Sequence, residues 1–189
     1  MNWRKPSVIL LTWVNLLPLV GVFLWDWNIV TILMLYWLES VFIGALNVPK
    51  ILMCQGSPSS KIFTSAFFTV HYGGFAAGHL MALGFLLHLD KPLEYFQIVG
   101  PMFWLAAISL FLSHLYSFFA NFLGQQEYTE RSESEQMFKP YRRVFILHFI
   151  ILFGGVFIMS LPHLEYLIVL LVLLKIALDV RAHLKDHMS

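Results

Sequence analysis

Hydrophobic residues occur in six long runs, which polar stretches separate. A helix needs about 20 mostly apolar residues to cross the hydrocarbon core of a bilayer. The runs that meet this requirement cover residues 7–24, 29–52, 62–88, 97–121, 143–161 and 164–184. The pattern predicts an all-α fold, a polytopic bundle of six transmembrane helices that forms a single domain over residues 1–189.

The polar breaks between the runs predict how the helices connect. The breaks at Asp26, at 90–92 and at 161–163 are very short, so the helices on either side of each should form antiparallel hairpins. The break at 55–61 is a turn rich in glycine, serine and proline. The longest break, 124–140, is interpreted as a solvated connector in preference to a short surface helix.

Lysine and arginine lie almost entirely on one side of the predicted bundle. With the N-terminus inside, ten of the twelve face the cytoplasm, Lys91 lies outside, and Lys175 lies within a span. The positive-inside rule then places both termini in the cytoplasm. The basic start before the first run has no small-residue cleavage site after it, so we interpret it as a retained signal anchor. These features predict a multi-pass protein of the cell's inner (cytoplasmic) membrane.

Composition agrees with a membrane protein and restricts the partners. The chain is 59% hydrophobic and 12% charged, whereas a soluble domain has about 25% charged residues. Membrane lipids are therefore the expected surroundings. A net charge of +1 gives no reason to expect a nucleic-acid partner. The single cysteine, Cys54, excludes an internal disulfide and a cysteine-rich metal site.

Nine polar side chains lie inside the predicted spans, where an ionisable group costs at least ~2.5–3.5 kcal/mol at the helix centre. Such groups face the bundle interior and usually serve a function. A GxxxG element, Gly74 to Gly78, predicts close helix approach on the third span. The nine side chains are Glu39, Asn47, His71, His79, His114, His148, Lys175, Asp179 and His183.

The depths of these side chains converge when each is counted from the cytoplasmic edge at ~1.5 Å per residue. His71 falls at about 12 Å, and Glu39 and Lys175 lie near mid-membrane, at about 15–20 Å. The convergence predicts a polar, histidine-rich cavity that opens toward the cytoplasmic leaflet. Four side chains share a depth of about 8–10 Å: Asn47, His114, His148 and Asp179.

The residue types in this cavity favour a metal site, because imidazole and carboxylate groups bind zinc or iron. Glu39 would carry protons, and Lys175 or Asn47 would stabilise an oxyanion. The resulting hypothesis is a metal-dependent hydrolase or transferase that acts on a lipid-like substrate. The predicted ligands are His71, His114, His148, Asp179 and His183, of which the last two are one helical turn apart.

Three other interpretations stay open. His71 or His79 could ligate haem together with His148 from a facing helix, and a quinone pocket is a related possibility. The same polar groups could form a transport or proton pathway. They could also pair with one another, for example Glu39 with Lys175, and serve helix packing alone.

Several segments resemble, in the same order, a prokaryotic family of small integral membrane proteins catalogued as a domain of unknown function. The resemblance runs from about residue 30 to 184 and implies a six-helix membrane fold, but no activity. The segments are Tyr36-Trp37-Leu38-Glu39 with Gly44 and Asn47, His71-Tyr72-Gly73-Gly74 with His79, Ser113-His114 with Asn121, Pro140-Tyr141-Arg142-Arg143 with His148 and Gly154-Gly155, and Lys175 with Asp179 and His183.

A looser similarity is to the membrane hydrolases that include alkaline ceramidases and adiponectin receptors. Those proteins hold zinc near the inner leaflet in a seven-helix bundle. This chain has six predicted spans, and Asp179-x-x-x-His183 stands where those proteins have HxxxH. The similarity therefore serves as an analogy of site chemistry.

Overall fold

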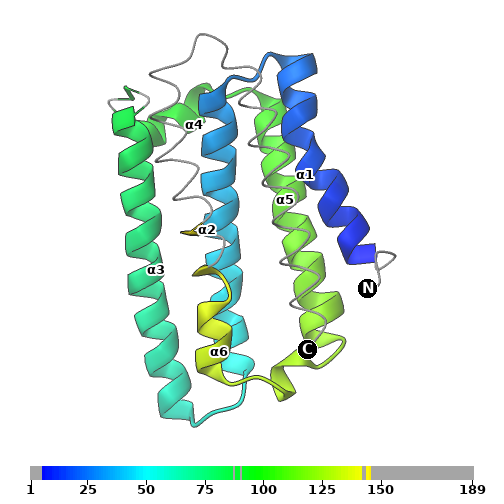
Figure 1. The fold of residues 1–189 in the computed structure, drawn as a ribbon, viewed down its shortest axis with the longest axis vertical. Helices are drawn as coiled ribbons and strands as arrows, with labels where there is room; N and C mark the ends of the chain where they lie inside the picture. The colour runs from blue at the N-terminus through cyan, green and yellow to red at the C-terminus, as the bar shows by residue number, and fades with distance from the viewer. Residues whose placement is uncertain (1–5, 87, 90, 142–143, 146–189) are drawn as a thin grey trace.

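The computed structural model describes residues 6–86, 88–89, 91–141 and 144–145. These residues form an all-α structure, as predicted, and no β-strand is present among them. The predicted spans 143–161 and 164–184 lie almost wholly outside the described residues. The helices are α1 (Pro6–Trp25), α2 (Ile29–Met53), α3 (Pro58–Leu86), α4 (Tyr95–Ile98), α5 (Pro101–Ser117) and α6 (Glu133–Phe138), as shown in Figure 1.

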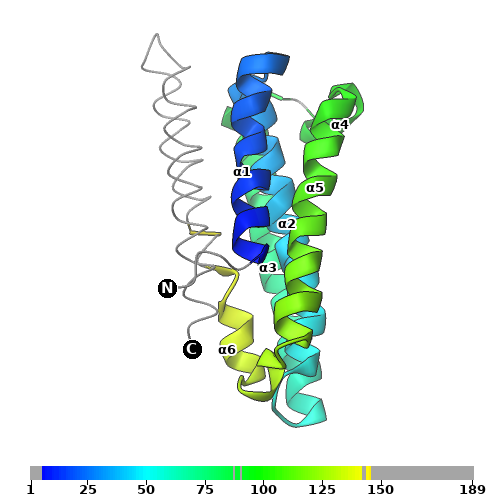
Figure 2. The ribbon, with the colours of Figure 1, turned by 90° about the vertical axis from the view of Figure 1, so that its right-hand side faces the viewer.

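Helix α2 lies at the centre of the described bundle (Figures 1 and 2). It packs against α3, α5 and the short α6, while α1 packs mainly against α5. Residues 31–37 of α2 are all buried, so the helix is covered on every side along this stretch. A helix that is apolar all round is stable only when it is enclosed in this way.

Local signals explain where most helices begin. The Asn28 side chain caps α2 by accepting from the Thr31 amide at 3.0 Å. Pro58 and Pro101 stand at the first positions of α3 and α5, where the missing N–H costs nothing. The predicted span 97–121 is therefore wrong at its start, because the chain bends at Gly100 between α4 and α5.

Two helices of the described residues are long and apolar enough to cross a membrane: Ile29–Met53, which is α2, and Pro101–Leu123, which is α5 with its π-helical end. Length and composition alone decide this test, and enclosed core helices also pass it. Helix α3 is longer than either but less apolar. The segment Trp13–Trp25 of α1 is apolar but shorter.

Helices α2 and α3 pack closely at Gly44. A Cβ atom at Gly44 would overlap the ring of Tyr72 on α3. The Tyr72 hydroxyl donates to the Ser40 carbonyl at 2.9 Å and so fixes the ring over Gly44. No described atom lies within 4 Å of a Cβ placed at Gly74 or Gly78. The described residues thus show no close packing on these two glycines, although Trp37 Nε1 of α2 donates to the Ala76 carbonyl between them at 2.8 Å, and the predicted role of the GxxxG element stays untested.

Candidate functional site

The most deeply enclosed ionisable pair joins α2 to α5. His114 Nε2 lies 3.0 Å from Glu39 Oε1, and the two side chains are 12% and 3% exposed. Such burial is costly for an ionisable group unless it is hydrogen-bonded. Two of the predicted site residues therefore meet, but Glu39 contacts a histidine that sequence reasoning had assigned to a separate role as metal ligand.

The geometry of this pair sets the role of each ring nitrogen. If Glu39 is ionised, its carboxylate can only accept hydrogen bonds and Nε2 carries the shared proton, and a neutral imidazole then has its lone pair on Nδ1. A histidine oriented by a carboxylate is the usual arrangement of a general base or a metal ligand. The pair is thus chemically competent for either role.

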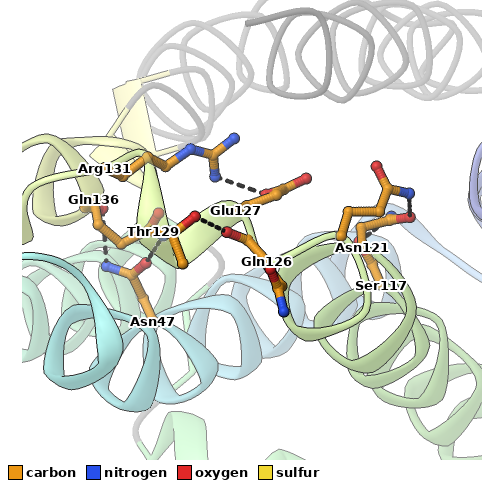
Figure 3. A network of polar contacts seen from close by, with 9 residues as sticks. Asn47, Ser117, Asn121, Gln126, Glu127, Thr129, Arg131 and Gln136 are labelled. Carbon is orange, nitrogen blue, oxygen red and sulfur yellow. Dashed lines mark hydrogen bonds and ion pairs between the residues drawn. The ribbon is translucent and has the colours of Figure 1, made fainter.

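A polar stripe continues from His114 toward the α6 end of the bundle. The chain leaves α5 as a π-helix over Phe118–Leu123, a form that occurs frequently at functional sites. Asn121 Nδ2 donates to Ser117 Oγ at 3.1 Å, and Gln125 Nε2 donates to Asn121 Oδ1 at 3.2 Å. Figure 3 shows the contact between Asn121 and Ser117. The stripe places hydrogen-bonding groups between the buried pair and the end of the bundle.

Asn47 lies in a second polar contact, which joins α2 to α6 (Figure 3). Gln136 Nε2 donates to Asn47 Oδ1 at 2.7 Å, and Asn47 Nδ2 donates to the Gln136 carbonyl at 3.3 Å. Both residues are 2% exposed. The predicted oxyanion role of Asn47 stays untested, but its described partner is a structural amide.

The connector 124–140 contains the short surface helix that was the alternative to a plain solvated connector, and most of its residues are exposed or partly exposed. Helix α6 contacts both α2 and α3. Its start carries a complete capping box, in which Ser132 and Glu135 satisfy each other's backbone amides. Arg131 pairs with Glu127 at 2.7 Å just before it (Figure 3). The sequence signal for α6 is the Ser-x-x-Glu pattern before Met137, which the sequence analysis passed over.

Two carboxylates tie this helix to its surroundings in a pH-dependent way. The hydrogen bond from Ser60 Oγ, 2.6 Å long, holds the pKa of Glu133 below its ordinary value of 4.5. The backbone amide of Ser132 likewise lowers the pKa of Glu135. Ionisation of both groups therefore favours the folded position of α6.

We expect acidification to weaken the attachment of α6. A lowered folded-state pKa contributes stability above the unfolded pKa, and this stability is lost as pH falls through the folded pKa. Thermal unfolding midpoints measured from about pH 6 to about pH 3 should fall, and the fall should be smaller in Glu133→Gln. An equal fall in wild type and variant would contradict the role of Glu133.

His71 lies apart from the Glu39–His114 pair. Its Nδ1 is 2.7 Å from the Tyr141 hydroxyl, and its ring stacks on Phe67 at 5.1 Å. The side chain of His71 is exposed, whereas that of His79, about two helical turns further along α3, is buried. The contacts of His71 are therefore aromatic, and they include neither Glu39 nor His114.

The predicted metal set is only partly described. His148, Lys175, Asp179 and His183 lie outside the described residues. Within the described part of the chain, no group of three histidine, cysteine, aspartate or glutamate side chains is close enough to hold a metal ion. His114 with Glu39 is the portion of the predicted site that this part of the chain brings together.

Helical packing and an enclosed carboxylate–imidazole pair define the chain as an all-α bundle with a polar interior contact. The chain belongs to a family of unknown function, DUF6498, whose model matches residues 2–189. This confirms the resemblance to a domain of unknown function over nearly the whole chain. Comparison with curated proteins and with solved structures gives no match.

Proposed function

We propose that this chain is an integral protein of the inner (cytoplasmic) membrane, with six spans and both termini in the cytoplasm, that catalyses metal-dependent hydrolysis or group transfer on a lipid-like substrate. The observation that carries the catalytic part is the buried Glu39–His114 pair within an apolar bundle. Both residues lie on helices that are long and apolar enough to cross a membrane, so a substrate with apolar character suits the site best.

Exposed apolar side chains support the membrane part of the proposal. Val70 and Phe85 on α3 are 77% and 83% exposed, and Leu105 and Ile108 on α5 are 57% and 53% exposed. Soluble monomers rarely expose large contiguous apolar patches, whereas lipid covers them without cost. The exposed faces of α3 and α5 are therefore expected to contact acyl chains.

Basic side chains support the orientation. Lys50 ends α2, Lys61 lies in the first turn of α3, and Arg131 and Lys139 flank α6. All four therefore lie at the α6 end of the bundle in Figure 1. The positive-inside rule makes this end cytoplasmic. The Glu39–His114 pair then connects to the cytoplasmic side through the Ser117–Asn121 stripe.

The Glu39–His114 pair also supports the metal-dependent chemistry. A metal-ligating histidine almost always donates its other ring N–H to a carboxylate or carbonyl, which fixes the ring and raises its basicity. His114 has this arrangement with Glu39. Zinc or iron would supply a Lewis acid and an activated water. The proposal keeps His148, Asp179 and His183 as the further ligands and Lys175 as the oxyanion partner.

Elemental analysis and a visible absorption spectrum of the detergent-purified protein test this proposal. We expect close to one zinc or iron per chain without a Soret band, and at least a tenfold lower metal content in His114→Ala. Ser109→Ala on the same helix is the matched control, because its hydroxyl only donates to the Leu105 carbonyl.

Two results would contradict the metal-hydrolase proposal. A Soret band that is lost in His114→Ala would move the case to haem binding and redox chemistry. Protein purified without chelators that contains neither metal nor pigment would leave transport or helix packing as the role of these groups.

A further inference from the structure

A pocket of about 580 Å³ lies at the end of the bundle opposite α6, where the α1–α2 turn meets α4 and the start of α5 (Figure 1). This volume is typical of small-molecule sites, which are about 300–1,000 Å³. The lining combines aromatic rings with a carboxylate and contains Trp25, Asp26, Trp27, Tyr95 and Phe103. The pocket is separate from the Glu39–His114 pair.

The aromatic rings of this pocket are tilted relative to one another. Trp25 and Trp27 have ring centroids 5.5 Å apart at 48°, and Trp27 and Phe103 are 6.3 Å apart at 55°. The Tyr95 hydroxyl is fixed by a 2.7 Å hydrogen bond with Thr31 Oγ1. Phe103 is 1% exposed and forms the floor of the pocket, whereas Trp25, Trp27 and Tyr95 are partly exposed around it.

Trp27 is held in place by the backbone of α1. Its amide donates to the Gly21 carbonyl at 3.0 Å. A Cβ atom at Gly21 would overlap the indole ring. A glycine at this position therefore lets the indole lie directly against α1, and the position of the ring is built into the fold.

Asp26 supplies the charge of the pocket. It is exposed and has a φ of 51°, a conformation that few residues other than glycine adopt. Within the described residues no ion pair involves Asp26, and Lys91 in the loop before α4 pairs with Glu94 at 2.8 Å. The bond from the Trp27 amide to the Gly21 carbonyl closes the end of α1 around this left-handed residue, so the helix end fixes the backbone position of Asp26 at the pocket.

We propose that this pocket binds an organic ammonium group, either the headgroup amine of a membrane lipid or a free small cation. Faces of tryptophan and tyrosine attract cations through the ring quadrupole, and aromatic cages recognise quaternary ammonium ligands in this way. The Asp26 carboxylate adds the opposite charge. This inference stands independently of the function proposed for the Glu39–His114 pair.

Binding of choline and of ethanolamine to the purified full-length protein tests the proposal. Isothermal titration at constant ionic strength, with sodium chloride as the balancing salt, should give saturable binding. The neutral analogue 3,3-dimethylbutan-1-ol has the shape of choline without its charge and should not bind. A second set of titrations adds choline or ethanolamine to the protein in nanodiscs of phosphatidylglycerol, either alone or mixed with phosphatidylcholine or phosphatidylethanolamine. A lipid that occupies the pocket through its own ammonium group should lower the affinity for the added compound.

Two variants change the pocket, and circular dichroism of each checks that the helices are retained. Asp26→Asn removes the charge but still tolerates the positive φ, and it should weaken binding about tenfold. Trp27→Leu removes one ring and should weaken binding to a similar degree. Trp13→Phe is the control, since Trp13 is 69% exposed on α1 and does not line the pocket.

The outcomes separate clearly. Saturable binding of choline or ethanolamine that is weakened in Asp26→Asn supports the proposal. Weaker binding of these compounds in nanodiscs with phosphatidylcholine or phosphatidylethanolamine identifies a lipid headgroup as the source, and equal binding in all nanodiscs identifies a free ligand. Equal binding of the neutral analogue, or unchanged affinity in Asp26→Asn with correctly folded protein, overturns it. Absence of binding to every ammonium compound also overturns it.

Discussion

Replacing Glu39 with leucine should lower the free energy of unfolding by about 1–3 kcal/mol, the range found when a buried hydrogen-bonding group is left without its partner. Glu39 is 2% exposed, and its carboxylate lies against His114 Nε2. Leucine offers no acceptor to that ring nitrogen, so a buried polar group loses a partner. Unfolding in mixed detergent with sodium dodecyl sulfate measures the change.

Glu39→Gln separates the structural from the chemical part of this role. The glutamine carbonyl can still accept from His114, so the loss of stability should be well below that of Glu39→Leu. The amide has no negative charge with which to raise the basicity of the imidazole, so metal content should fall about 10–100-fold. If Glu39→Gln keeps its full metal content, Glu39 is a packing residue and does not orient a ligand.

The helix boundaries followed largely from local signals in the sequence. Asn28 at the start of α2 and Pro58 at the start of α3 act within one helical turn, so no knowledge of the tertiary structure is needed to interpret them. The same holds for the capping box at Ser132, which would have favoured the short surface helix over the solvated connector. The burial of α6 could not be inferred in this way, because it depends on where α2 and α3 lie.

The pairing of Glu39 with His114 required information that depth counting does not contain. Counting from residue 121 placed His114 at about 8–10 Å and Glu39 deeper. The structure extends this helix as a π-helix to Leu123, which moves His114 about 3 Å further from the end. The remaining difference in depth between His114 and Glu39 is small enough for their side chains to reach each other. Depth counting placed Glu39 and His114 in the same half of the bundle, but it could not show that they contact each other.

The functional assignment of Asn47 shows the same limit more sharply. Its type and its position inside a span indicate a polar role, and the structure does place it in a hydrogen-bonded pair. Its partner is Gln136, from a segment interpreted as solvated, so no spacing rule within the spans leads to it. The close contact between α2 and α3 was equally hard to locate, since it lies at Gly44 of α2, against the Tyr72 ring, and no sequence motif marks that glycine.

Asn47→Leu should detach α6 from the bundle and lower the free energy of unfolding by about 1–3 kcal/mol, because it leaves Gln136 buried with unsatisfied polar atoms. Gln136 is 2% exposed, and its Oε1 already lacks a partner among the described residues. The loss of the 2.7 Å bond from Nε2 therefore leaves the whole amide without a side-chain partner. Limited proteolysis within 124–140 and detergent unfolding report the two effects.

A double-mutant cycle with Gln136→Leu identifies the origin of this loss. Replacing both amides by leucine removes the unsatisfied atoms, so the double variant should be more stable than the sum of the single losses predicts, by about 0.5–3 kcal/mol. If the two losses simply add, the contact does not hold α6 in place, and Asn47 becomes available for the oxyanion role proposed for it. The proposed hydrolysis or transfer on a lipid-like substrate then distinguishes the two roles of Asn47. A packing role leaves the double variant active, whereas a catalytic role leaves it folded but inactive.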